Sequence, residues 1–360
     1  MRRGVLGAWS LAAAAGLVNA ACGFARPIPA APLAADSAHP APLHQRWLTR
    51  EAQGFLGPVA IRHDTVYGAG YDRRVAAVNL ADGKVIWEYR MPGGVAAGVV
   101  MAGDTLFTAS DRPDGAVVAV DRRTGKDFWK RRVGLVGVSL GLVGDKVMVA
   151  PRTGGLVALD VADGRVRWRR RMAAVVVRPL AGGPGEVIVA TYDSLFRLSL
   201  ADSGLRGGVR APGPVSAPWV PIDDSLVLLA TGNGLVSAIR RSDLRTEWTV
   251  QLDGPIVVTP TVTDDTIWVG TQSGTIYRIP LAAPRAERML ALDHPFTAPL
   301  VHWDSLLLAG RADGILQAFG PDGTERWEIA VGRPLVQPPL LLSDGFVVLG
   351  GRGDLHRFTR

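Results

Sequence analysis

Two series of short motifs, each recurring eight times, predict an all-β fold for residues 44–360. In one series, an alternating apolar segment leads through a Gly-containing turn to a segment with Trp, as in 117–129 (VVAVDRRTGKDFW). In the other, a polar residue opens a short apolar segment, as in DTLFTAS from Asp104. Period-two alternation and abundant Val favour strands, and no amphipathic helical periodicity appears in this region.

The first series repeats about every 40 residues. Its Trp position falls near residues 47, 87, 129, 168, 207, 248, 288 and 327. Two copies, 195–208 and 276–289, have lost the Trp. Turns such as Asp82-Gly83 supply the positive φ that a tight hairpin needs. Six copies keep the aromatic residue: Trp47, Trp87, Trp129, Trp168, Trp248 and Trp327.

The second series has the same count and phase. Its opening positions are spaced 39 to 41 residues apart: Asp64, Asp104, Asp145, Gly185, Asp224, Asp265, Asp304 and Asp344. Each period has room for four short strands, beginning with an apolar strand rich in Pro and Gly. Four strands every 40 residues are typical of one blade of a β-propeller. The sequence therefore predicts an eight-bladed β-propeller of four-stranded blades, in which the Trp residues pack between adjacent blades.

The two ends of the repeat region complement each other. Residues 351–360 match the alternating third strand, and no Trp segment follows them. Residues 44–48 form a Trp segment that precedes the first full repeat. We therefore predict that the strand around Trp47 completes the last blade and closes the ring, which removes exposed strand edges.

Three Trp residues lie outside the repeat register. Trp268 falls in an Asp-led strand and is expected in the core, whereas Trp219 and Trp303 lie near strand ends. These two are candidates for an exposed binding surface. The longest connections without a clear pattern, around residues 206–221 and 282–299, are the candidate binding loops.

Residues 1–21 have the features of an export signal. Arg2 and Arg3 precede an apolar stretch, residues 5–18, which is too short for a membrane span. Small residues follow, and then Cys22, the only Cys in the chain. This junction resembles the lipobox of bacterial lipoproteins, although Asn19 stands where Leu is usual. The resemblance implies that Cys22 is lipidated. Cleavage after Ala20 would instead give a soluble periplasmic protein.

The remaining sequence divides into two parts. Residues 22–43 carry the predicted lipidated Cys and a Pro/Ala-rich tether, and residues 44–360 form the propeller. The formal charge of +7 is spread along the chain. No basic motif interleaved with aromatic residues accompanies it, so nucleic-acid binding is not expected.

No catalytic motif stands out in the sequence. The six His residues lack metal-ligand spacing, and no nucleophile elbow, P-loop or dinucleotide fingerprint is present. With one Cys, a disulfide framework and a Cys-based metal site are excluded. We expect no catalytic residues, no bound metal and no cofactor.

The repeat pattern G-x-[LV]-x-A-[LV]-D-x-x-[TD]-G-[KR]-x-x-W is matched best by residues 115–129 and 155–168. It resembles the PQQ-like repeat family, and the resemblance covers residues 44–360. Quinoprotein dehydrogenases of this kind carry an adjacent Cys pair and Glu, Asn and Asp ligands for calcium. A single Cys cannot form that pair, so a quinone-dependent dehydrogenase is the least favoured alternative.

The export signal, Cys22, tether and eight repeats together resemble the BamB family of outer-membrane assembly lipoproteins. That resemblance implies a non-enzymatic periplasmic scaffold that contacts the barrel-forming subunit of the β-barrel assembly machinery. Gly23 follows Cys22, and the absence of the inner-membrane retention signal Asp implies anchoring in the outer membrane. The propeller itself is expected to be monomeric. The alternative is a PQQ-like propeller that binds another periplasmic protein or a polysaccharide.

Overall fold

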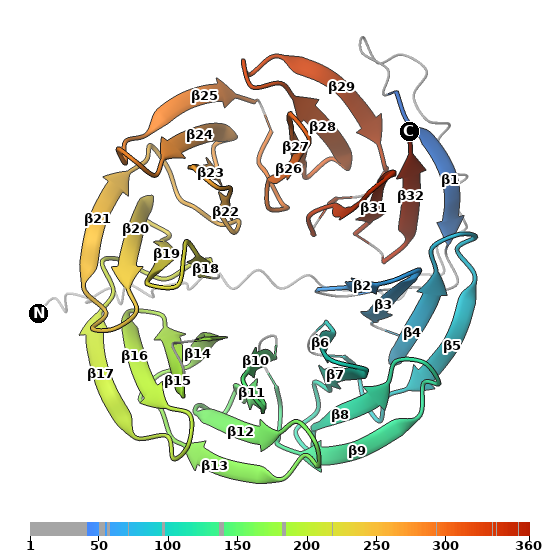
Figure 1. Ribbon diagram of the computed structural model, residues 1–360, viewed down its shortest axis with the longest axis vertical. Coiled ribbons are helices and arrows are strands. Elements are labelled where there is room, and N and C mark those ends of the chain that lie inside the picture. Colours follow the sequence, from blue (N-terminus) through green and yellow to red (C-terminus); the bar gives the residue numbers. More distant parts are fainter. Residues whose placement is uncertain are drawn as a thin grey trace, which may run out of the picture. The chain divides into compact units, whose positions relative to one another are not determined.

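The computed structural model describes residues 42–49, 55, 58–70, 72–95, 98–136, 140–181, 185–217, 219–292, 294–332, 334–335, 337–351 and 353–360. Every described residue belongs to one compact unit, Leu33–Arg360. In that described part, all regular structure is β: thirty-two strands form eight four-stranded sheets. The sheets follow one another around a ring (Figure 1). The predicted eight-bladed β-propeller is confirmed.

Each blade is an antiparallel sheet. In seven blades the strands run outward from the centre in chain order, and in the eighth β1 is the outermost strand. Blade 1 contains β2 (Ala60–Arg62), β3 (Thr65–Ala69), β4 (Arg74–Asn79) and β5 (Val85–Arg90). Blade 2 contains β6 (Val100–Ala102), β7 (Thr105–Ala109), β8 (Ala116–Asp121) and β9 (Asp127–Arg132). Blade 3 contains β10 (Gly141–Val143), β11 (Lys146–Val149), β12 (Leu156–Asp160) and β13 (Val166–Arg170). Blade 4 contains β14 (Val176–Ala181), β15 (Glu186–Thr191), β16 (Ser194–Ser199) and β17 (Leu205–Arg210).

The second half of the ring repeats the arrangement. Blade 5 contains β18 (Val220–Pro221), β19 (Leu226–Ala230), β20 (Leu235–Arg240) and β21 (Thr246–Gln251). Blade 6 contains β22 (Thr261–Val262), β23 (Thr266–Gly270), β24 (Thr275–Pro280) and β25 (Glu287–Ala291). Blade 7 contains β26 (Val301–Trp303), β27 (Leu306–Gly310), β28 (Ile315–Phe319) and β29 (Glu325–Ala330). Blade 8 contains β30 (Leu340–Leu342), β31 (Gly345–Leu349), β32 (Leu355–Thr359) and β1 (His44–Thr49).

The hydrophobic core lies in the gaps between blades. Each of the eight clusters of buried apolar residues in the described chain is shared by two neighbouring blades. Middle strands such as β3 and β12 are buried along their whole length. Because each sheet has a blade on both sides, both faces of these strands are covered, which explains their nearly continuous apolar sequences. Outer strands such as β5 alternate between partly buried and exposed residues.

The ring is closed by the first strand of the propeller. β1 pairs antiparallel with β32, from His44 opposite Thr359 to Thr49 opposite Leu355. The Arg46 guanidinium adds a hydrogen bond to the Thr359 hydroxyl at 2.9 Å. Figure 1 shows β1 (blue) beside β32 (red), which confirms the predicted closure. No free edge is left on β32.

The strand connections define two opposite faces of the ring. Turns between first and second strands, and between third and fourth strands, share one face, here called the Asp-turn face. They are tied together by backbone hydrogen bonds, for example from Arg122 N to Asp104 O at 3.0 Å. Turns between second and third strands, and the connections between blades, form the other face, here called the connection face. A typical bond there runs from Arg152 N to Leu135 O at 2.7 Å.

Candidate binding surfaces

The outer-strand Trp residues join neighbouring blades. Trp87 of blade 1 donates its indole N–H to the carbonyl of Arg122 in blade 2, at 2.8 Å. Its ring covers Gly125 in the same turn, where an added Cβ would lie 2.7 Å from Trp87 Cε3. Three other junctions have the same indole hydrogen bond: Trp47 to Leu80, Trp129 to Val161, and Trp168 to Leu200. These rings therefore pack between neighbouring blades.

The remaining repeat Trp residues lie in the core in other ways. Trp248 is partly buried in the cluster between blades 5 and 6. Trp327 is buried and stacks on Phe346 of blade 8, with ring centroids 6.2 Å apart. In blade 4 the Trp position holds Gly207, opposite Arg197.

Trp219 and Trp303, the candidates for an exposed binding surface, are both buried. Trp219 is only 4% exposed, because it inserts between blades 4 and 5. Trp303 is 7% exposed and packs edge-on against Trp327 and Phe346. Trp268, expected in the core, is only partly buried.

The candidate binding loops also need correction. Residues 206–221 include most of β17, and residues 282–299 include β25, so neither segment is a long irregular connection. Both outer strands form without a Trp because their backbone pairs with the third strand of the blade.

Exposed apolar side chains gather on the connection face around blades 4 to 6. Val175 is 55% exposed and Tyr192 is 65% exposed. They adjoin the first pair of β14 and β15, Val176 opposite Thr191, so they lie next to each other. The connection to blade 5 joins them through a hydrogen bond from Val215 N to Tyr192 O at 2.8 Å.

Val257 extends this surface toward blade 6. Ser216, next to Val215, donates its hydroxyl to the carbonyl of Ile256 at 2.5 Å. The following residue, Val257, is exposed. Val175, Tyr192 and Val257 are called the connection-face patch below. The other exposed large apolar residues of the described chain lie on outer or innermost strands: Ile86, Phe128, Leu205 and Leu341.

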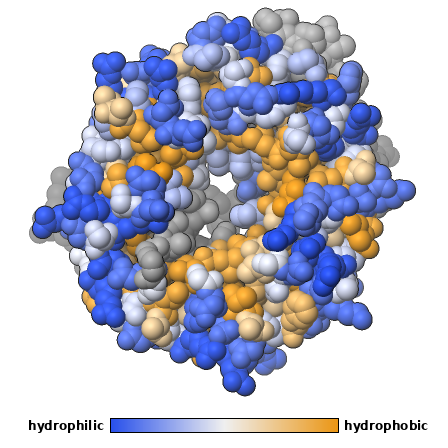
Figure 2. Space-filling model, viewed as in Figure 1, coloured by the Kyte–Doolittle hydropathy of each residue, from blue (hydrophilic) through white to orange (hydrophobic). Residues whose placement is uncertain are grey.

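Apolar residues also surround the central opening, whereas hydrophilic residues dominate the outer rim of the face seen in Figure 2. The innermost strands that surround the opening are short and largely apolar, such as β6 and β30. Leu341 of β30 is exposed there.

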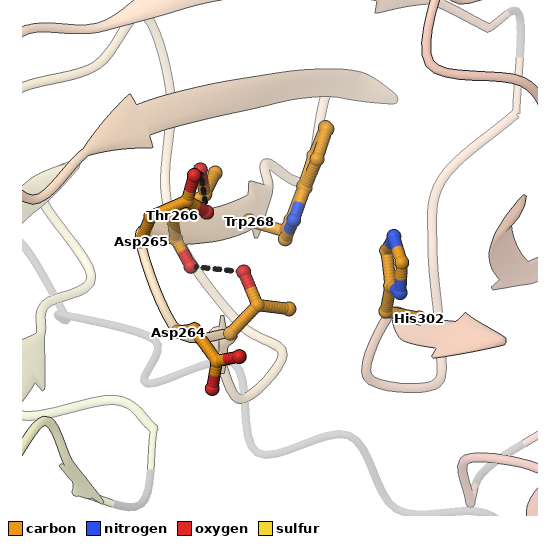
Figure 3. Close-up of a pocket in the computed structure, with 6 residues that line it drawn as sticks. Asp264, Asp265, Thr266, Trp268 and His302 are labelled. Carbon is orange, nitrogen blue, oxygen red and sulfur yellow. Dashed lines mark hydrogen bonds between the residues drawn. The ribbon is translucent and has the colours of Figure 1, made fainter. Parts of the chain in front are cut away.

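A pocket of about 440 Å³ lies on the Asp-turn face between blades 6 and 7. Blade 6 contributes the turn residues 263–266 and Trp268, and β26 contributes His302. The Thr263 hydroxyl donates to Thr266 O at 2.9 Å, and the Thr266 hydroxyl donates to the Asp265 carboxylate at 2.9 Å. In Figure 3, His302 lies across the gap from the two Asp residues, with Trp268 between them.

Ion pairs within the chain balance several of the Asp carboxylates on the Asp-turn face. Asp104 accepts a hydrogen bond from Arg122 Nε at 2.7 Å, and this contact holds the pKa of Asp104 below its ordinary value. Lys146 likewise donates to Asp145 at 2.6 Å and lowers the pKa of that carboxyl. In the described chain, four of the turns between first and second strands pair an Asp carboxylate with a cation.

The described residues include no group of three His, Cys, Asp or Glu side chains placed to hold a metal ion. His294 and His302 are exposed, and buried His356 has Nε2 2.7 Å from Asp354. The described chain also has no helix long and apolar enough to cross a membrane. Cys22, the export signal and nearly all of the predicted tether fall outside the described residues.

The ring has eight blades built on one repeat, Trp residues that pack at most junctions between blades, and a last blade completed by the first strand. These features define a β-propeller of PQQ-like repeats. The sequence profile of the family described as "Outer membrane protein assembly factor BamB" matches residues 44–114, 113–207 and 202–334. The chain belongs to this family, which confirms the family resemblance inferred from the repeat pattern.

Solved structures show the same fold at low sequence identity. BamB from Moraxella catarrhalis has a TM-score of 0.73 and 17% identity, covering 87% of this chain and 100% of that one. The Saccharomyces cerevisiae protein Sqt1 has a TM-score of 0.74 and 13% identity, covering 86% and 97%. The computationally designed protein Ika8 has a TM-score of 0.73 and 11% identity, with the same coverage. At these identities the likeness extends to the fold alone.

One enzyme shares a short stretch of sequence. The 1-butanol dehydrogenase (quinone) of Thauera butanivorans is 30% identical over 91 residues. The match covers 23% of this chain and only 14% of the enzyme's length. It is therefore shorter than three repeats.

Proposed function

We propose that this protein is a non-catalytic scaffold that assists the assembly of outer-membrane β-barrel proteins. The family match across residues 44–334 carries the proposal. A lipid on Cys22 would hold the propeller at the periplasmic side of the outer membrane. The single Cys supports a binding role, since it cannot provide the Cys pair of quinoprotein dehydrogenases.

The connection-face patch is the proposed docking surface for the barrel-forming subunit. Exposed apolar side chains gain about 25 cal/mol for each Å² removed from water, so a partner that covers this patch is stabilised by it. Tyr192 combines a large apolar ring with a hydroxyl, the type of side chain that dominates many protein interfaces.

Affinity capture from native outer-membrane extract tests this function. The mature protein should recover the barrel-forming subunit, and Tyr192→Ser should lower that recovery roughly tenfold. Phe128→Ser is the matched control: Phe128 is 58% exposed but lies on the outer strand of blade 2. Equal loss in the two variants, or enrichment of a different partner, would contradict the proposal.

Two further measurements address the anchor and the chemistry. Incorporation of a palmitate analogue should be lost in Cys22→Ser, whereas an unlabelled wild-type protein would indicate the soluble periplasmic alternative. Purified protein with quinone and calcium should not reduce a redox dye. Sustained dye reduction would establish the dehydrogenase alternative and refute the non-catalytic role.

A further inference from the structure

The pocket between blades 6 and 7 contains two carboxylates that the described chain leaves without an ion pair. Asp264 and Asp265 stand in the turn where four other blades place a paired Asp. Those pairs are Asp104 with Arg122, Asp145 with Lys146, Asp304 with Arg360, and Asp344 with Arg357. Four of these turns therefore balance their negative charge with a cation, whereas the corresponding turns of blades 1, 5 and 6 have no ion pair to their Asp in the described chain.

The adjoining turn of blade 6 lacks the Arg that pairs with Asp104 in blade 2. In blade 2, Arg122 donates its backbone N–H to Asp104 O, and its side chain pairs with the Asp104 carboxylate. In blade 6, the equivalent backbone bond to Asp265 O comes from Leu281, at 2.8 Å. An aliphatic side chain cannot balance the carboxylate. The turn keeps its backbone geometry but lacks its internal cation.

An aromatic ring completes the pocket. Trp268 occupies the β23 position that Phe107 occupies in β7, but Phe107 is fully buried whereas Trp268 is partly exposed. Its ring lies beside the Asp turn in Figure 3. The described residues that line the pocket include no Lys or Arg. Two carboxylates near a partly exposed indole ring favour a cation, and a planar cation can both stack and pair.

The same chemistry is already used one blade further around the ring. Arg360 places its guanidinium 4.6 Å from the ring centroid of Trp303 and pairs with Asp304. A Trp, an adjacent Asp and an Arg thus form a complete site from the chain's own residues. The pocket offers the Trp and the Asp without the Arg.

We propose that this pocket binds an arginine side chain of a partner protein. The guanidinium stacks on Trp268 and donates hydrogen bonds to Asp264 and Asp265, while His302 bounds the far side. Arginine fits better than lysine because its planar fork can stack and bond to a carboxylate at once. The site lies on the Asp-turn face, opposite the connection-face patch. Both faces could therefore be occupied simultaneously, and the proposal does not depend on the assembly role.

Fluorine NMR of the protein labelled with 5-fluorotryptophan tests the site directly. The resonance of Trp268 is identified by its disappearance in Trp268→Phe. An arginine peptide with both ends capped should shift this resonance saturably, whereas the same peptide with neutral citrulline should not.

Charge variants decide whether the two carboxylates are responsible. Asp264→Asn combined with Asp265→Asn should weaken peptide binding roughly tenfold or more, since charge-assisted hydrogen bonds are lost. Asp224→Asn removes a charge at the equivalent turn of blade 5, where the aligned residue Leu228 is buried, and should leave binding unchanged. Both variants alter only exposed turn residues, and their melting temperatures verify folding.

Three results would overturn the assignment. Equal shifts with the citrulline peptide would show that charge is not recognised. Equal affinity for a lysine peptide would exclude stacking of a planar guanidinium. Unchanged binding in the double variant, or an equal loss in Asp224→Asn, would place the contact elsewhere on the surface. None of these results would affect the capture experiment on the connection face.

Discussion

Substitution of Gly125 by Ala tests whether the Trp contacts between blades stabilise the ring. Gly125 has φ of +73° and lies beneath the Trp87 ring. The left-handed conformation costs Ala about 1–2 kcal/mol. The new methyl would also lie 2.7 Å from Trp87 Cε3, well inside van der Waals contact. Such overpacking typically costs about 1–3 kcal/mol. We therefore expect Gly125→Ala to lower the free energy of unfolding by about 2–5 kcal/mol.

Gly185 provides a matched control. Its φ is also +73°, but an added Cβ would meet nothing within 4 Å. Gly185→Ala should therefore cost only the conformational part, about 1–2 kcal/mol. Urea unfolding of the two variants and the wild-type protein, followed by circular dichroism, gives the comparison.

A variant without Trp87 measures the contribution of the contact between the Trp87 ring and the residue at position 125. In a Trp87→Leu background the collision is removed, so the extra cost of Gly125→Ala should fall to that of Gly185→Ala. Equal destabilisation by the two glycine substitutions in the wild-type background would refute the reasoning. The Trp rings would then cover the turns without restricting them.

Two more predictions concern closure and pH. Deletion of residues 44–49 removes β1 and leaves β32 as a free edge, so we expect a lower melting temperature and concentration-dependent association, measured by calorimetry and sedimentation. Unchanged melting would contradict the closure role. The hydrogen bonds from Arg167 and Ala162 N lower the pKa of Asp160, so its carboxylate stabilises the fold above its unfolded pKa of about 4. Asp160→Asn should cost about 1–3 kcal/mol at pH 7, and the difference should vanish as the pH falls through the lowered pKa. A difference that persists at low pH in urea titrations would exclude this cause.

The blade count and the closure were predictable because they depend on local requirements that recur. A turn such as 122–126 needs a Gly at positive φ, and the Trp of the preceding blade needs that same Gly to stack. Because these requirements recur from blade to blade, the Gly and Trp residues that meet them recur periodically in the sequence. Even where the Trp is absent, as at Gly207, backbone pairing within the blade preserves the outer strand.

The binding surfaces were much less predictable. Trp219, Trp268 and Trp303 look similar in sequence, yet packing between blades buries Trp219 and Trp303 and leaves Trp268 partly exposed. Trp268 and His302 line the same pocket although they belong to neighbouring blades. They lie near each other only because of the way the blades are arranged around the propeller. Val175 and Tyr192 adjoin through a single strand pair that no motif marks.

The pairing of β1 with β32 restricts the order in which the blades can form during synthesis. Seven blades consist of four consecutive strands, so each can form as soon as its own segment is available. Blade 8 must wait, because the strand made first pairs with the strand made last. An incomplete chain would therefore always present an unpaired edge, which other proteins or chaperones can recognise. Closure of the ring therefore requires that the whole propeller segment, from β1 to β32, has been synthesised.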